Sequence, residues 1–175
     1  MVNNQNEFNN TYSKEIKEIE IEDEYDFEGQ LSVTDYSNLE KLYLHDVDSI
    51  KKITLKNLPR LQECTVWDCG MKELVIENCP RIKKLNVRSN SLTSLDFFNG
   101  LSLSKIEELD VDVEGNPEID KLLKPYNGDW KVWLKEEMRK LKRYQKRASY
   151  DIQSSIKKNE ERVATQIEIP PKGRN

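Results

Sequence analysis

Residues 82–95, IKKLNVRSNSLTSL, carry the spacing that decides the fold, and the polar Asn90 lies among their apolar side chains. Those apolar side chains stand at Ile82, Leu85, Val87, Leu92 and Leu95. Their intervals of 3, 2, 5 and 3 residues fit neither the period of a helix nor the alternation of a long strand. The interval of 2 indicates a short strand, and the longer intervals indicate the corners of a flattened coil.

The same pattern recurs along the chain at intervals of 23, 22, 21 and 24 residues. Aligned on Ile82-x-x-Leu85-x-Val87, the other copies begin at Ile16, Leu39, Leu61 and Ile106. A second series, offset by about half a period, begins at Ile50, Met71 and Leu92. Each repeat therefore makes two extended passes, and neither pass can bury its apolar side alone. We expect copies stacked about 4.8 Å apart to enclose a continuous core between two walls.

Asn90 follows the first strand of its repeat, at a turn where backbone groups point into the core. A side-chain amide there can both donate and accept hydrogen bonds, whereas an apolar residue leaves a penalty of about 1–3 kcal/mol. Cys69 occupies this position one repeat earlier, and Val47 occupies it two repeats earlier. We expect Asn90 to be buried and hydrogen-bonded to the backbone.

The stretches LQECTVWDCGMKEL and IKKLNVRSNSLTSL resemble the leucine-rich-repeat pattern L-x-x-L-x-L-x-x-N/C-x-L over about residues 16–119. The fourth repeat matches fully and the third nearly so, while the others match in the strand. The period and the phrase ENCPRI are similar to short-repeat members, such as internalins and intracellular and fungal leucine-rich proteins. The resemblance implies an α/β leucine-rich-repeat solenoid of about five repeats, whose parallel strands form a concave wall that binds a protein partner.

The outward side chains of that wall predict a binding surface. Tyr43, His45 and Trp67 lie on neighbouring strands beside Arg88, and Tyr, Trp and Arg are enriched at binding hot spots. Alternatively, the aromatic side chains merely cover their neighbours or pack against a flanking segment. Acidic residues flank the centre, at Glu18, Glu20, Glu22 and Asp23 on one side and Glu108, Asp110 and Asp112 on the other. The predicted partner-binding residues are Lys41, Tyr43, His45, Thr65, Trp67, Asp68, Asn86, Arg88 and Asp110.

The residue pattern does not predict catalysis. His45 is the one histidine, and no Cys, Asp or Glu cluster surrounds it at metal-ligand spacing. We find no nucleophile with a base, no phosphate-binding glycine loop and no paired carboxylates. We therefore predict that the chain is not an enzyme and binds no cofactor or metal.

Cysteine usage and the start of the chain bear on location. Cys64, Cys69 and Cys79 form no CxxC pair, and we interpret them as structural, free thiols of a reducing compartment. No run approaches the roughly 18 apolar residues of a membrane span, and the first residues do not resemble a secretory signal. These features favour the cytoplasm, with the nucleus as an alternative.

Charge divides the chain into an acidic body and a basic end. Residues 1–128 carry 15 basic and 25 acidic side chains, whereas residues 129–175 carry 13 basic and 7 acidic ones. We predict a disordered N-terminus (1–13), the solenoid (14–116), a short capping helix and turn (117–128), a long basic helix (129–162) and a flexible tail (163–175). Trp130 and Trp133, with Ile119, Leu122 and Leu123, are expected to cap the last repeat.

The stretch RKLKRYQKR, residues 139–147, places six basic side chains around Leu141 and Tyr144. Such a helix can bind nucleic acid, anionic lipid or an acidic protein, can self-associate weakly, or is simply a solvated face. Taken together, the sequence favours a non-catalytic protein-binding module. The alternatives are a nucleic-acid-associated or membrane-tethered protein acting through this helix, or a regulatory segment of a signalling enzyme complex.

Overall fold

A computed structural model describes residues 4–22, 29–47, 50–102 and 107–166, with side chains described as far as residue 160. The chain divides into two compact units, residues 1–128 and 129–175, and each is described by itself below.

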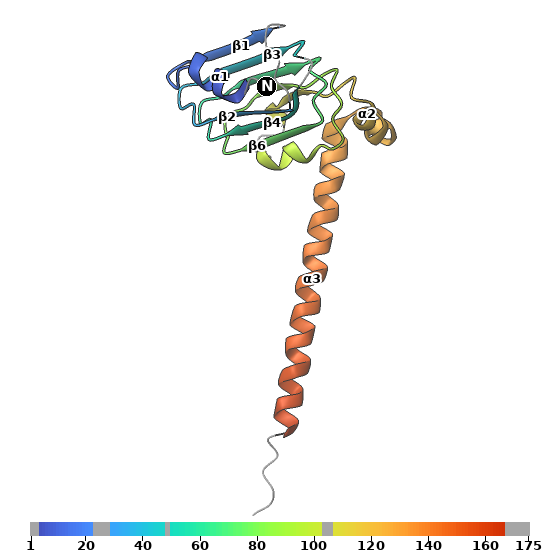
Figure 1. Cartoon of the computed structure of the whole chain (residues 1–175). Helices are drawn as coiled ribbons and strands as arrows, with labels where there is room; N and C mark the ends of the chain where they lie inside the picture. Colours follow the sequence, from blue (N-terminus) through green and yellow to red (C-terminus); the bar gives the residue numbers. More distant parts are fainter. Residues whose placement is uncertain (1–3, 23–28, 48–49, 103–106, 167–175) are drawn as a thin grey trace, which may run out of the picture. The chain divides into compact units, whose positions relative to one another are not determined.

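The first unit is a solenoid of parallel strands arranged in two sheets (Figure 1). Its first sheet has the order β1 (Glu18–Glu22), β3 (Lys41–His45), β5 (Glu63–Trp67), β7 (Lys84–Asn86), β8 (Asp110–Asp112). Its second sheet has the order β2 (Gly29–Thr34), β4 (Ile50–Lys56), β6 (Glu73–Glu77). From β1 to β7 consecutive strands alternate between the sheets, so the chain coils as the repeat predicted.

Alternate residues of each strand point between the two sheets and are buried, as the two-residue interval indicated. In β3, for example, Leu42 and Leu44 are buried, while Tyr43 between them is partly exposed. The second sheet repeats this pattern, with Ile53 and Leu55 of β4 fully buried. The continuous core between two walls of parallel strands is therefore confirmed.

The strand register confirms the first three repeat intervals and corrects the fourth. Ile19 pairs with Leu42, Leu42 with Cys64 and Cys64 with Leu85, as aligned. We predicted Leu109 opposite Leu85, but Val111 takes that place. The prediction slipped by two residues because such a shift keeps the same side chains facing inward, and because Leu109, Val111 and Val113 are all apolar.

The second pass of the chain also differs from prediction at both ends of the stack. The sequence pattern missed strand β2, whose buried residues are Leu31 and Val33. It predicted an extended pass at Leu92–Phe97, where the chain forms the 3₁₀ helix η1 (Asp96–Gly100) against β6. Gly100 explains this close approach, because a Cβ atom there would lie 1.8 Å from the carbonyl oxygen of Ile76.

Replacing Gly100 by alanine should therefore lower the free energy of unfolding by about 1–3 kcal/mol, the usual range for an overpacked contact. Urea unfolding followed by circular dichroism measures this loss. Asn99→Ala is the control, since Asn99 lies exposed in the same 3₁₀ helix. Equal stability of the two variants would show that η1 does not pack on the backbone of β6.

Residues in the left-handed conformation turn the chain where strands of both sheets end. In the second sheet these are Asp35, Asn57 and Asn78, with φ of 61°, 54° and 55°. Asn and Asp tolerate this conformation better than most other residues. The amide of Asn78 donates to Asn57 at 2.9 Å, and that of Asn57 donates to Asp35 at 2.8 Å. The corners thus carry a side-chain ladder parallel to the stacking direction.

Asn90 is buried and bridges two turns of the solenoid, as predicted. Its Oδ1 accepts from the backbone N–H groups of Cys69 at 3.2 Å and Met71 at 3.1 Å. Its Nδ2 donates to the carbonyl oxygens of Val66, Val87 and Arg88 at 2.7, 3.0 and 3.0 Å. The amide therefore satisfies backbone groups that water cannot reach.

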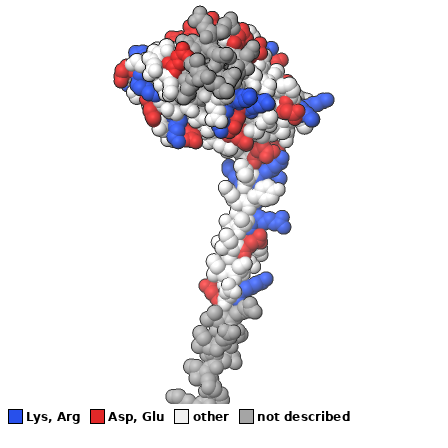
Figure 2. Space-filling model, in the orientation of Figure 1, with Lys and Arg blue, Asp and Glu red and all other residues white. Residues whose placement is uncertain are grey.

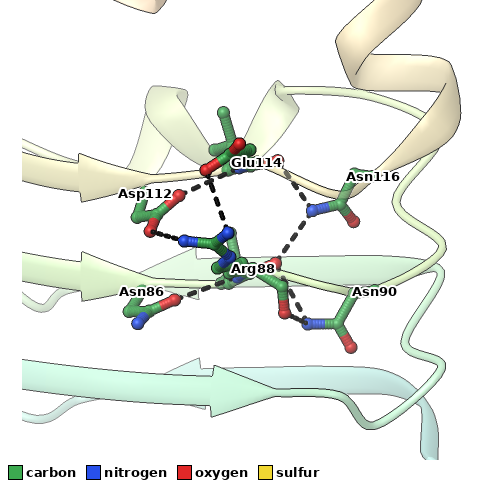
Figure 3. Close-up of polar contacts among 8 residues, drawn as sticks. Asn86, Arg88, Asn90, Asp112, Glu114 and Asn116 are labelled. Carbon is green, nitrogen blue, oxygen red and sulfur yellow. Dashed lines mark hydrogen bonds and ion pairs between the residues drawn. The ribbon is translucent and has the colours of Figure 1, made fainter.

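Asn116 repeats this arrangement one turn further along (Figure 3). Its Oδ1 accepts from the N–H of Leu92 at 3.0 Å, and its Nδ2 donates to the carbonyl oxygens of Val87 at 2.9 Å and Val113 at 2.8 Å. Sequence reasoning missed this role because of the two-residue error in register. Once Val113 is aligned with Val87, Asn116 falls at the position of Asn90.

The prediction of disorder over residues 1–13 does not hold for the part of this segment that the structure describes, which begins at residue 4. Residues Asn4–Thr11 form helix α1, and Phe8 is fully buried with its ring 6.0 Å from that of Tyr36. The side chain of Gln5 accepts from the N–H of Ser32 at 2.6 Å and donates to its carbonyl oxygen at 2.9 Å. It thus satisfies two backbone groups of β2, so α1 covers an open end of the stack (Figure 1).

Two α-helices and a 3₁₀ helix follow the last strand. Helix α2 (Pro117–Leu123) has Pro117 in its first turn and is followed by the 3₁₀ helix η3 (Lys124–Tyr126). In the second unit, α3 runs over Trp130–Gln166, four residues beyond the predicted end at 162. Asp129 caps it, because its Oδ1 accepts from the N–H groups of Lys131 at 2.8 Å and Val132 at 3.1 Å. The capping role of Trp130 and Trp133 at the last repeat stays a prediction.

Candidate protein-binding face

The outward side chains of the first sheet, which we call the sheet face, form three rows across the strands. The registers β1–β3–β5–β7–β8 place one residue of each strand in each of the first two rows, and the third row continues past the ends of β7 and β8 to Arg88 and Glu114. The rows are Glu18, Lys41, Glu63, Lys84 and Asp110; Glu20, Tyr43, Thr65, Asn86 and Asp112; and Glu22, His45, Trp67, Arg88 and Glu114.

An aromatic pair occupies the centre of the third row. The rings of His45 and Trp67 lie 4.1 Å apart between centroids, at 33° between planes. The inward positions of β5 belong to Cys64 and Val66, which are fully buried, so Trp67 must point outward. Its side chain is 37% exposed. The structure therefore brings together two of the flat rings of the predicted surface.

The two ring nitrogens of His45 have different surroundings, because Nδ1 lies near a carboxylate and Nε2 has no hydrogen-bond partner among the described residues. Its Nδ1 lies 3.4 Å from Oδ2 of Asp46. Its Nε2 is buried and has no hydrogen-bond partner among the residues that the structure describes. A buried ring nitrogen without a hydrogen-bond partner costs free energy.

Tyr43 adds a third ring to the aromatic surface, in the row next to that of His45 and Trp67. Its side chain in β3 is also hydrogen-bonded to a side chain in β5. Its phenol donates a hydrogen bond to Oε2 of Glu63 at 2.9 Å. Burial, together with this hydrogen bond and the charge of Glu63, raises the pKa of the Tyr43 phenol from 10.0 to about 12. The ring is therefore uncharged and fixed in position at neutral pH.

The raised pKa of Tyr43 predicts a loss of stability at alkaline pH. The folded state holds the phenol proton to a higher pH than the unfolded state does, so folding should weaken as the pH rises from about 10 towards 12. Tyr43→Phe should lose less stability over this range, as measured by urea unfolding at a series of pH values. Tyr150→Phe in α3 is the control, and it should keep the full loss.

Arg88 is paired with two carboxylates, those of Asp112 in β8 and of Glu114 just after that strand (Figure 3). Its Nη1 lies 3.8 Å from Asp112 and its Nη2 lies 3.2 Å from Glu114. The corrected register produces this contact, since Asp112 is opposite Asn86. Asp110, which we had placed in the row of Asn86, instead pairs with Lys84. Arg88 thus lies in the row of Trp67, and Glu114, which the sequence analysis did not include, lies beside it.

The remaining predicted residues lie around this centre. Thr65 and Asn86 lie in the middle row and are partly exposed, while Lys41 lies in the first. Asp68 is exposed in a left-handed turn directly after β5, with φ of 53°. All nine predicted residues thus lie on or beside the same face, around the pair of His45 and Trp67. Of the acidic residues expected at its edges, Asp23 lies outside the described residues.

The cysteines contribute to the core and not to the sheet face. All three are buried, and none forms a disulfide bond within the part of the chain that the structure describes. Burial raises the pKa of the Cys64 thiol to about 12 and also raises that of Cys79. Thiols of this kind are poor nucleophiles at neutral pH, which agrees with the structural role predicted for them.

Comparison with protein-family models, with curated proteins and with solved structures found no match to this chain. Within the described part of the chain, none of the helices combines the length and apolar character needed to cross a membrane. What the chain does must therefore be inferred from the sheet face and from α3.

Proposed function

We propose that the chain is a non-catalytic protein-binding module of the leucine-rich-repeat type, which holds its partner on the sheet face. The observation that carries the proposal is the exposed Trp67, stacked on His45 and held by the middle strand of five. An aromatic side chain fixed by a strand loses little conformational entropy on binding and buries a large area. The cytoplasm, or alternatively the nucleus, is the proposed location.

The surroundings of Trp67 support a protein partner. Charged and polar side chains, including Glu22, Arg88 and Glu114, surround the aromatic centre in the three rows. An apolar centre within a polar rim is typical of protein interfaces, and Trp, Tyr and Arg are the side chains enriched at their hot spots. Tyr43 is held by Glu63, and Arg88 is held by Asp112 and Glu114, so both side chains are positioned before a partner arrives.

Trp67→Ala should weaken binding of a partner on the sheet face by about 2 kcal/mol or more, some thirtyfold. Stability should change far less, because the side chain is outside the core. The test is affinity capture with the wild-type chain, identification of the captured protein, and measurement of its Kd for both chains by calorimetry.

The matched control changes the other candidate element, α3. Arg143→Glu with Arg147→Glu in the capturing chain leaves its sheet face unchanged and should therefore leave a partner of that face bound. If this double variant abolishes capture while Trp67→Ala does not, the sheet face is inert and the basic segment of α3 is the functional element.

The exposed basic segment of α3 favours a second candidate function, association with nucleic acid or anionic lipid. All side chains from Arg139 to Arg147 are exposed, as such contacts require. Binding of this kind would fall steeply with salt concentration. Binding that is insensitive to salt and sensitive to Trp67→Ala would exclude it.

A further inference from the structure

The sheet face is acidic at both of its ends. Its three rows contain seven acidic and three basic side chains. One of the basic side chains, Arg88, is already paired with Asp112 and Glu114. All three carboxylates of β1, at Glu18, Glu20 and Glu22, are exposed. The negative electrostatic potential over β1 and β8 therefore favours a positively charged partner.

The second unit carries a segment with the opposite charge. Residues 139–147 contain six basic and no acidic side chains, and all nine are exposed. Leu141 and Tyr144 within the segment are 58% and 70% exposed. Charged side chains of both signs are visible along α3 in Figure 2, with uncharged ones between them. Apart from Ser154, the side chains from Arg139 to Glu160 are exposed, so this part of the helix gains little from tertiary packing, which supplies most helical stability.

The basic segment is shorter than the sheet face is wide, so its side chains must span the remaining distance. Five strands about 4.8 Å apart place β1 and β8 about 19 Å from each other. A helix laid across the strands covers this width in about 13 residues. Residues 139–147 span about 12 Å, so the long side chains of Arg139 and Arg147 must together extend about 7 Å beyond the segment to reach both acidic strands while Leu141 or Tyr144 lies over Trp67.

We propose that the sheet face of one copy of the chain binds the basic segment, residues 139–147, of α3 in a second copy. The inference rests on the proposed function, because it takes the sheet face to be a protein-binding surface, and it names the partner. If each of two copies binds the basic segment of the other, a closed dimer forms. If each copy instead binds the segment of a different neighbour, the copies form an open-ended assembly. Binding orders α3 and covers Trp67.

The test uses the full chain and measures its mass by sedimentation velocity over a range of protein and salt concentrations. We expect association at low salt that weakens as screening increases. Charge reversal of the segment (Lys142→Glu, Arg143→Glu, Lys146→Glu) should weaken association about tenfold or more. Reversal of β1 (Glu18→Lys, Glu20→Lys, Glu22→Lys) should do the same. Mixing the two charge-reversed chains should restore association between them, because their surfaces are again complementary.

Two comparisons make the result specific. Lys157→Glu with Lys158→Glu reverses two exposed charges of α3 outside the segment and should leave association unchanged. Circular dichroism of every variant checks that it folds. A wild-type chain that stays monomeric at low salt, or charge-reversed chains that do not recover when mixed, would overturn the inference. Capture of another protein that still depends on Trp67 would then show that the proposed function survives without it.

Discussion

Replacing Asn90 by leucine is expected to lower the free energy of unfolding by at least about 3 kcal/mol, although leucine is the more apolar side chain. The loss arises in the backbone around Asn90. The N–H groups of Cys69 and Met71 both donate to its Oδ1, and leucine offers them no acceptor. The carbonyl oxygen of Val66 also loses a donor at 2.7 Å.

Urea unfolding of the variant and the wild-type chain measures this effect. Asn99→Leu is the matched control, because Asn99 is exposed and the same substitution there should change stability by less than about 0.5 kcal/mol. Asn116→Leu should resemble Asn90→Leu, since its amide satisfies Leu92, Val87 and Val113 in the same way. An unchanged midpoint for Asn90→Leu would show that Asn90 faces solvent and that the register of the fourth repeat is wrong.

The sequence predicts the solenoid because burial follows the strand period. Each strand of the first sheet hides alternate residues, and the interval between strands stays within two residues of 22 until β7. Asn90 was predictable for a related reason: a polar residue in the middle of an apolar pattern needs partners. The position of Asn90 in the repeat and the hydrogen-bonding capacity of its amide both indicate a buried bridge, so the neighbouring sequence was enough to predict it.

The sequence-based predictions failed in two situations. In one, the local pattern fits two strand registers equally well, and in the other, the local structure depends on residues that are distant in the sequence. A two-residue slip of β8 leaves apolar residues facing inward in both registers, so periodicity does not separate them. The pairing of Arg88 with Asp112 and Glu114 depends on that register. Helix α1 depends on contacts that are distant in sequence, because Phe8 packs against Tyr36 and Gln5 binds Ser32. An Asn-rich stretch gives no sign of such partners.

The sheet face was only partly predictable for the same reasons. Alternation along β5 was enough to place Trp67 outside and Cys64 and Val66 inside. The stacking of Trp67 on His45 and the hydrogen bond from Tyr43 to Glu63 depend on side-chain conformations that no periodicity specifies. The pattern thus identifies the surface, whereas the contacts determine which of its side chains are held in place.

Leu85 tests the core of the solenoid directly. It is fully buried in β7, where it pairs with Cys64 of β5 on one side and Val111 of β8 on the other. The strands on both sides are tied together by backbone hydrogen bonds and cannot close easily around a smaller side chain. A cavity left at this point should therefore persist, and the cost of a cavity grows with the volume that remains.

Leu85→Ala should accordingly lower the free energy of unfolding by about 2–5 kcal/mol, measured by urea unfolding with circular dichroism. Leu122→Ala removes the same atoms from a leucine of α2 that is 39% exposed, and it should cost much less because little of that surface leaves water on folding. The difference between the two variants isolates the contribution of burial. Equal losses would place Leu85 outside the core, and the corrected pairing of Leu85 with Val111 would then be untenable, because that register requires both side chains to face inward.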